Sequence, residues 1–225
     1  TATNDPSVYA KARENFDRLI AEGALRRDGQ AHFYLYRQIM GEHTQLGLVA
    51  VASCAEYDAN TIRKHEFTRP DKEDDRVAHL EVLDAQTGPV FLTYSADAEL
   101  DALFDRVAAG EPDVDFTAPD GVRHTSWTIA AGEDTAFVES RFDGIPNLYI
   151  ADGHHRSAAA SRVNQSRSGA GTSDLFLTVI FPHDQMQILA YNRAVKDLNG
   201  LSIDEFRTAL GQTFEIEPSG QAKPT

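Results

Sequence analysis

Apolar residues along the chain follow two different periods, which predicts a mixture of helices and strands. Between Asp5 and Gly23 they recur at roughly helical spacing, and an Asp followed by Pro at the start is typical of a capped helix. Residues 32–37 and 44–53 are instead rich in aromatic and β-branched side chains. A short polar turn separates these two runs, so they predict the two strands of a hairpin.

The same two periods and the turn residues between them predict further elements along the rest of the chain. Helices are predicted over residues 71–84, 98–107, 133–142 and 154–164, and Ser202 is predicted to cap a last helix. Strands are predicted over residues 90–94, 124–129, 147–151 and 213–216, with a further pair over 175–181 and 186–191. Residues 165–173, rich in Ser and Gly, are predicted to form a flexible loop. Strands and helices mix without strict alternation, so an α+β fold is favoured over a doubly wound sheet.

Composition and charge narrow the range of partners. Of the 225 residues 41% are hydrophobic, which is enough for a folded core. The 35 acidic and 21 basic residues give a net charge of −14, which repels a phosphate backbone and excludes most nucleic-acid partners. The longest apolar runs, residues 47–55 and 176–181, are far shorter than the ~20 residues that span a bilayer, so no membrane partner is expected.

The single cysteine, Cys54, excludes an internal disulfide, and its apolar neighbours predict an inert thiol in the core. The N-terminus has no signal-peptide pattern, so a cytoplasmic location is expected. The chain begins with Thr1 rather than Met and ends soon after a predicted strand. We therefore expect a single domain over residues 1–225 that is a piece of a longer protein.

The segment Asp152-Gly153-His154-His155-Arg156 stands where a predicted buried strand turns directly into a predicted helix. The first N–H groups of a helix are free and carry partial positive charge, so this position favours an anion. Gly153 permits close approach of the backbone to a ligand, while Arg156 and the two imidazoles add donors that suit phosphate. These residues predict a phosphate-binding site.

Asp152 complicates this interpretation, because its carboxylate repels phosphate unless a metal ion bridges the two groups or the side chain caps the helix and faces away. An N-capped helix with exposed histidines is the purely structural alternative. The chain has neither a Walker-type phosphate loop nor a Gly-x-Gly-x-x-Gly fingerprint. Zinc is disfavoured, because adjacent histidines on a helix point about 100° apart and the chain lacks a His-Glu-x-x-His motif and paired cysteines.

A second cluster of candidate residues lies before and within the predicted helix that begins at residue 71. Glu66 stands beside His65 on a predicted loop, where it is either a general base or an ordinary surface carboxylate. Lys72 and Arg76 lie four residues apart on the helix and share a face. They either bind an anion together or pair with acidic neighbours on the same helix.

Residues 149–156 closely resemble the signature of a widespread bacterial family, the domain of unknown function numbered ten-fifteen. The resemblance extends over nearly the whole chain and includes residues 34–38, 47–50, 65–76, 88–92 and 124–127. Members of this family are usually longer at both ends, which agrees with the expectation that the chain is a fragment.

The His65-Glu66 pair and the 152–156 segment are also similar to the active-site motifs of archaeal ADP-dependent free-serine kinases. Those enzymes share a nucleotide-binding superfamily with ParB and sulfiredoxin, in which a Gly-x-x-Arg helix start holds nucleotide phosphates. The resemblance implies a ParB/sulfiredoxin-like mixed sheet with flanking helices, ADP or ATP as the nucleotide, and Mg²⁺ beside Asp152. It implies Glu66 as the base for a substrate hydroxyl and Asp152 as a second essential carboxylate. The residues expected to bind the nucleotide are His65, Gly153, His154, His155, Arg156, Lys72 and Arg76.

These features predict a nucleotide-dependent phosphotransferase, similar to a serine kinase, that acts on a small hydroxyl substrate such as an amino acid. The alternative is a regulatory module that binds nucleotide without phosphoryl transfer. Lys64 replaces the proline that usually precedes the His-Glu pair, and Ser157-Ala158 replace a Tyr-Glu pair, which predicts a smaller and less polar pocket beside the phosphates. No segment matches the second domain that builds much of the kinase's serine pocket, so the resemblance does not identify the substrate.

Overall fold

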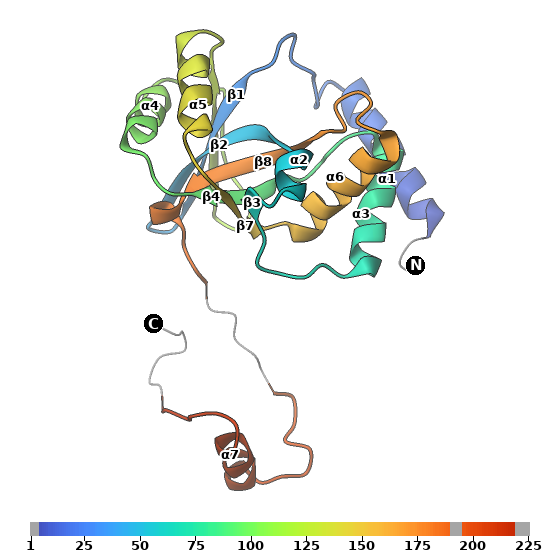
Figure 1. Cartoon of the computed structure of the whole chain (residues 1–225), viewed down its shortest axis with the longest axis vertical. Coiled ribbons are helices and arrows are strands. Elements are labelled where there is room, and N and C mark those ends of the chain that lie inside the picture. The colour runs from blue at the N-terminus through green and yellow to red at the C-terminus, as the bar shows by residue number, and fades with distance from the viewer. Residues whose placement is uncertain (1–4, 190–194, 219–225) are drawn as a thin grey trace. The chain divides into compact units, whose positions relative to one another are not determined.

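The computed structural model describes residues 5–189 and 195–218, which form eight strands, seven α-helices and one 3-10 helix (Figure 1). The helices are α1 (Pro6–Ala21), α2 (Cys54–Asp58), α3 (Pro70–Leu83), α4 (Ala98–Ala108), α5 (Glu133–Asp143), α6 (His154–Arg167), η1 (His183–Gln185) and α7 (Ile203–Gly211). The strands are β1 (Phe33–Met40), β2 (His43–Ser53), β3 (Ile62–Arg63), β4 (Val90–Tyr94), β5 (Val114–Thr117), β6 (Arg123–Ile129), β7 (Leu148–Asp152) and β8 (Leu175–Pro182). None of these helices combines the length and the apolar character that crossing a bilayer requires.

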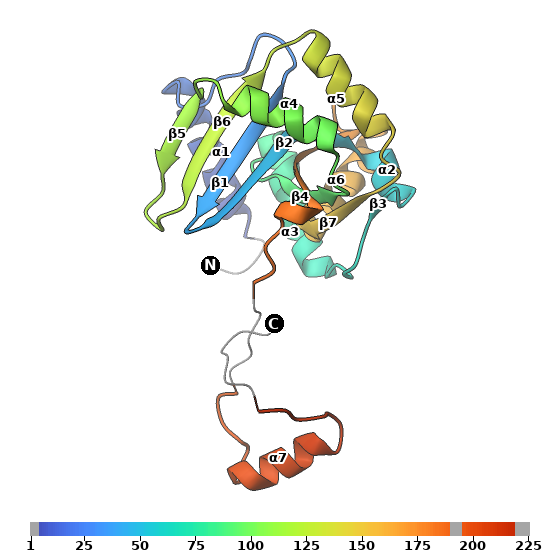
Figure 2. The same cartoon turned by 90° about the vertical axis from the view of Figure 1, so that its left-hand side faces the viewer.

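Contacts within the chain divide it into two compact units, with the boundary between Met186 and Gln187. The first unit is built on one mixed sheet with the strand order β3-β7-β4-β8-β2-β1-β6-β5. Its strand pairs are antiparallel except for β3 with β7 and β4 with β8. Figures 1 and 2 show α4 and α5 on one side of this sheet and α1, α3 and α6 on the other. The predicted α+β class is therefore confirmed.

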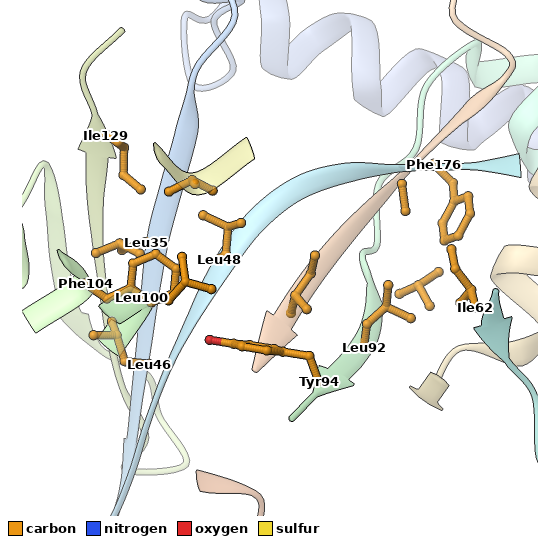
Figure 3. Packing of buried hydrophobic residues seen from close by; sticks show 14 of the residues in the cluster. Leu35, Leu46, Leu48, Ile62, Leu92, Tyr94, Leu100, Phe104, Ile129 and Phe176 are labelled. Atoms are coloured by element: carbon orange, nitrogen blue, oxygen red, sulfur yellow. The ribbon is translucent and has the colours of Figure 1, made fainter. Parts of the chain in front are cut away.

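Alternation of buried side chains along the strands explains where the core lies. In β4, Val90, Leu92 and Tyr94 are buried, as the period of two along a strand requires when one face is covered. They belong to one apolar cluster with residues of other elements, such as Leu35 of β1 and Leu100 of α4 (Figure 3). This cluster holds the central strands and the covering helices together.

Several helix starts carry the capping groups that the sequence predicts. The Asp5 carboxylate accepts a backbone hydrogen bond at the start of α1, and Asp97 accepts two at the start of α4. In the second unit, Ser202 and Glu205 form a reciprocal capping box at the start of α7. A capping side chain bonds to backbone N–H groups within three residues of itself, so these helix starts can be predicted from the local sequence.

Two predicted strands are wrong. Residues 186–189 continue from η1 without forming a strand, and residues 190–191 lie outside the described residues. Residues 213–216 leave α7 through a turn in which the N–H groups of Thr213 and Phe214 donate to the carbonyl of Leu210. A short apolar run becomes a strand only beside a pairing partner, and neither run has one in the part of the chain that is described.

Four short elements have no counterpart in the predicted pattern, namely α2, β3, β5 and η1. All residues of β5 are exposed at an edge of the sheet, so the strand lacks the alternation that would predict it. Helix α2 begins at Cys54, which is fully buried, and burial raises the pKa of this thiol to about 11. The predicted position of Cys54 in the core is thereby confirmed.

Helix α6 reaches Arg167, so the loop predicted from residue 165 begins only at Ser168, whose φ of +53° ends the helix.

Candidate functional site

Gly153 alone connects the end of β7 to the start of α6. Its φ is +101°, a region that favours glycine, and a Cβ at this position would lie only 3.1 Å from Nε of Arg156. The backbone angle and the close approach each require a residue without a side chain. The sharp turn predicted for this segment is therefore present.

The first turn of α6 has free backbone donors. Gly153 is the N-cap residue and makes no side-chain cap, and the N–H groups of His154 and His155 form no hydrogen bond to any described residue. Free N–H groups at the positive end of a 14-residue helix favour an anion. The alternative of an N-capped helix with two exposed histidines is wrong, because no side chain caps α6 and His154 is only 4% exposed.

Asp152 pairs with Arg156 and does not cap the helix. Its Oδ2 atom lies 2.5 Å from Nη2 of Arg156, and Nη1 of the same guanidinium donates to the carbonyl of Pro89. These two partners fix the guanidinium plane beside Gly153. The positive charge of Arg156 also offsets the repulsion that the Asp152 carboxylate exerts on a bound anion.

The segment that joins β3 to α3 runs near the start of α6 (Figure 1). The side chains of His154 and His155 accept hydrogen bonds from the backbone of this segment. The N–H of His65 donates to Nε2 of His154 over 3.4 Å, and the N–H of Arg69 donates to Nε2 of His155 over 3.1 Å. The partners in these two bonds are 89 and 86 positions apart in the sequence. Long-range contacts thus bring the His-Glu pair to the helix start.

Glu66 lies between these two attachment points, with its Oε2 atom 3.7 Å from Nδ1 of His154. Since Nε2 of His154 accepts a hydrogen bond, Nδ1 carries the proton in the neutral ring and faces the carboxylate. Burial lowers the pKa of His154, and the ring of His65, 4.4 Å away between centroids, acts in the same direction against the opposing charge of Glu66. The Glu66 side chain is 61% exposed, so a ligand can reach its carboxylate.

A pocket of about 370 Å³ opens at this point, here called the α6 pocket. It is lined by Glu66, Arg69, Lys72, Arg76, Asp152, Gly153, His154, His155 and Arg156. All of the site residues predicted from the sequence line it except His65, whose ring packs edge-on against the ring of His154. Four Lys and Arg side chains surround the pocket with only two carboxylates, although the chain has a net charge of −14. The pocket therefore concentrates positive charge on an acidic protein.

Lys72 and Arg76 are available to this pocket because their acidic neighbours on α3 have other partners. Glu73 pairs with Arg162 of α6 at 3.2 Å, and Asp75 accepts a hydrogen bond from a tyrosine hydroxyl of α1 at 3.0 Å. Among the described residues no carboxylate lies within 4.0 Å of the Lys72 ammonium, and the contact of Arg76 with Asp75 is long, at 3.9 Å. Of the two alternatives for this pair, the geometry favours a shared anion site.

No group of three or more His, Cys, Asp or Glu side chains in the described ranges is arranged to hold a metal ion. Mg²⁺ does not require such a group, because it commonly binds one or two carboxylates together with the phosphates of a substrate. Asp152 and Glu66 both line the α6 pocket and offer such oxygens. The residues present therefore fit a phosphate-bound Mg²⁺.

Two residues near the pocket are missed by the sequence pattern. Arg69 lines the α6 pocket, and its only signal in the sequence is a basic residue directly before Pro70, which begins a helix. Phe67 follows Glu66 and is fully exposed, which is unusual for so large an apolar side chain. Its signal is a single aromatic residue within a polar loop.

Comparisons with known proteins agree with the resemblance seen in the sequence. A family model described as "Protein of unknown function (DUF1015)" matches residues 1–225. The match covers the whole chain, so the resemblance to this family is confirmed. A search of the curated proteins and a search of the solved structures found no match.

Proposed function

This chain belongs to the DUF1015 family, and we propose that it is a nucleotide-dependent phosphotransferase that acts on a small hydroxyl substrate such as an amino acid. The observation that carries the proposal is the position of Glu66, whose carboxylate lies 3.7 Å from His154 beside the uncapped start of α6. A candidate base and a candidate phosphate-binding helix start are neighbours, as phosphoryl transfer requires.

The phosphates of ADP or ATP are proposed to bind at the free N–H groups of His154 and His155. Arg156 contributes a planar guanidinium whose position is already fixed by two partners, which reduces the entropy lost on binding. Lys72 and Arg76 neutralise further phosphate charge from α3. Catalysis by such a site consists mainly of positioning and stabilisation of charge.

In the proposed reaction, the substrate hydroxyl oxygen forms a bond to the terminal phosphorus of the nucleotide. The bond between that phosphorus and the bridging oxygen breaks, and the nucleotide leaves with one phosphate fewer. The hydroxyl proton passes to the Glu66 carboxylate, whose Oε2 atom lies 3.7 Å from Nδ1 of His154. Mg²⁺, when bound through the phosphates, would screen their charge from Asp152 and Glu66.

The proposal includes a ParB/sulfiredoxin-like type of fold for the first unit. Its support is the mixed sheet with helices on both sides, together with the Gly-x-x-Arg start of α6 formed by Gly153 and Arg156. A fold of this type positions nucleotide phosphates by the same kind of helix start that the α6 pocket contains.

One observation favours the alternative of a regulatory module that binds nucleotide without transfer. Ser157 is fully buried, and its hydroxyl donates to the carbonyl of His154 at 3.1 Å. Ala158 beside it is buried as well. These positions therefore offer the α6 pocket no polar side chain with which to hold a second substrate.

The proposal is tested by incubating the protein with ADP or ATP, Mg²⁺ and either free serine or a panel of other small hydroxyl compounds. Release of AMP or ADP is measured together with the phosphorylated product. Glu66→Gln is expected to bind nucleotide normally and to lose turnover by about 10²- to 10⁴-fold, the usual contribution of a general base. Glu81→Gln, an exposed carboxylate of α3 outside the α6 pocket, is the matched control.

Equal turnover in Glu66→Gln and Glu81→Gln would end the assignment of the base. Nucleotide binding that is lost in Arg156→Ala, with no product from any hydroxyl compound, would instead favour the regulatory module. These outcomes are separable because calorimetry measures binding and product analysis measures transfer.

A further inference from the structure

A second pocket adjoins the α6 pocket and differs from it in chemistry. It has a volume of about 350 Å³ and lies between the second half of α3 and the segment that joins α3 to β4. We call it the α3 pocket. Arg76 and Arg156 line both pockets and so form their common wall.

The α3 pocket combines an apolar and aromatic wall with polar groups. Leu80 and Leu83 of α3 and Val90 of β4 line it together with the ring of His79. This ring is held edge-on against Tyr9, with 4.9 Å between the ring centroids. The described lining contains no carboxylate. Arg76 and Arg156 add two guanidinium planes, and an apolar wall beside such planes suits a planar aromatic base.

The segment over residues 85–88 provides fixed backbone groups at this pocket. The side chain of Gln86 anchors it to β8, where its Oε1 accepts from the N–H of Leu177 at 2.5 Å and its Nε2 donates to the carbonyl of Leu175 at 2.9 Å. The N–H groups of Thr87 and Gly88 form no hydrogen bond within the described part of the chain. Backbone donors on an anchored segment are suited to the polar edge of a planar ligand.

We infer that the α3 pocket binds the base and sugar of the nucleotide whose phosphates lie in the α6 pocket, an inference that rests on the proposed function. Arg156 contacts residues of both pockets. It pairs with Asp152 of the α6 pocket and donates to the carbonyl of Pro89, next to Gly88 of the α3 pocket. A ligand with a charged end and a planar, less polar end matches this pair of pockets. Each pocket falls within the roughly 300–1,000 Å³ of small-molecule sites.

Calorimetric titration with ADP and with inorganic pyrophosphate, each without Mg²⁺, tests the inference. Pyrophosphate lacks the base and the sugar, so the wild-type protein is expected to bind ADP about tenfold or more tightly than pyrophosphate. Thr87→Trp places a large side chain at the exposed rim of the α3 pocket and is expected to weaken ADP binding about tenfold without changing the affinity for pyrophosphate. Thr117→Trp, at an exposed threonine of β5, is the control and is expected to change neither affinity.

Three results would overturn the inference, and they can be told apart. Equal affinity of the wild-type protein for ADP and pyrophosphate would show that the nucleoside part makes no contact, while leaving the α6 pocket as an anion site. Unchanged ADP binding in Thr87→Trp would place the base elsewhere. Failure of the wild-type protein to bind either ligand would remove the proposed function itself, and the inference with it.

Discussion

Replacement of Gly153 by alanine is the most direct test of the start of α6. A φ of +101° costs a residue with a side chain about 1–3 kcal/mol of unfolding free energy. The new methyl group would also lie 3.1 Å from Nε and 3.2 Å from Nη2 of Arg156, so the guanidinium has to move by a few tenths of an ångström. Loss of one hydrogen bond between a charged group and phosphate costs about 1.5–3 kcal/mol, or roughly 10- to 150-fold in affinity.

Gly121→Ala is the matched control for this substitution. Gly121 has a φ of +85°, but a Cβ there would meet no atom within 4 Å. It lies in the turn between β5 and β6, away from the α6 pocket. Both variants are therefore expected to lose a similar free energy of unfolding, and only Gly153→Ala is expected to lose affinity for pyrophosphate.

Two measurements decide the outcome. Denaturant unfolding is followed by the fluorescence of Trp127, the only tryptophan of the chain and a buried one, and pyrophosphate binding is followed by calorimetry. If Gly153→Ala binds pyrophosphate as tightly as Gly121→Ala does, the start of α6 is not where the anion binds. If Gly153→Ala is no less stable than the wild-type protein, the strain attributed to its φ is refuted.

Three further substitutions probe the surroundings of the pocket. His154→Gln is expected to make the free energy of unfolding less dependent on pH. Burial lowers the pKa of His154, so the unfolded chain binds more protons near the ordinary value of 6.5, and the wild-type free energy of unfolding falls as the pH drops through that value. If urea unfolding at pH 7 and at pH 5 shows the same loss of stability in both proteins, the prediction is contradicted. Asp152→Asn removes an exposed ion pair with Arg156 that is worth at most about 1 kcal/mol, so the melting temperature is expected to change little. Pyrophosphate without Mg²⁺ is expected to bind more tightly, because a repelling charge is gone, and weaker binding by calorimetry would contradict this prediction. Phe67→Ala alters a fully exposed side chain beside Glu66, so the melting temperature is expected to stay unchanged. The KM for the hydroxyl substrate in the product assay is expected to rise, and an unchanged KM would show that Phe67 takes no part in substrate binding.

The parts of the site that depend on near neighbours in the chain can be predicted from the amino-acid sequence. The turn at Gly153 and the helix start that contains Arg156 follow from steric rules and free amides within a few residues. Capping by Asp5, Asp97 and Ser202 is equally local, and these helix starts were predicted correctly. Alternating burial in β4 depends only on a period of two.

Which residues from distant parts of the chain come into contact depends on the complete fold. The positions of Glu66 and His65 beside α6 depend on hydrogen bonds between residues 89 and 86 positions apart. Lys72 and Arg76 line the α6 pocket, and their acidic neighbours Glu73 and Asp75 are bound by residues of α6 and α1. For the same reason residues 186–189 and 213–216, although predicted as strands, form none: neither segment has a pairing partner among the described residues. A cap or a glycine turn is complete within its own segment, whereas a strand pair or an ion pair requires a partner whose position only the folded chain sets.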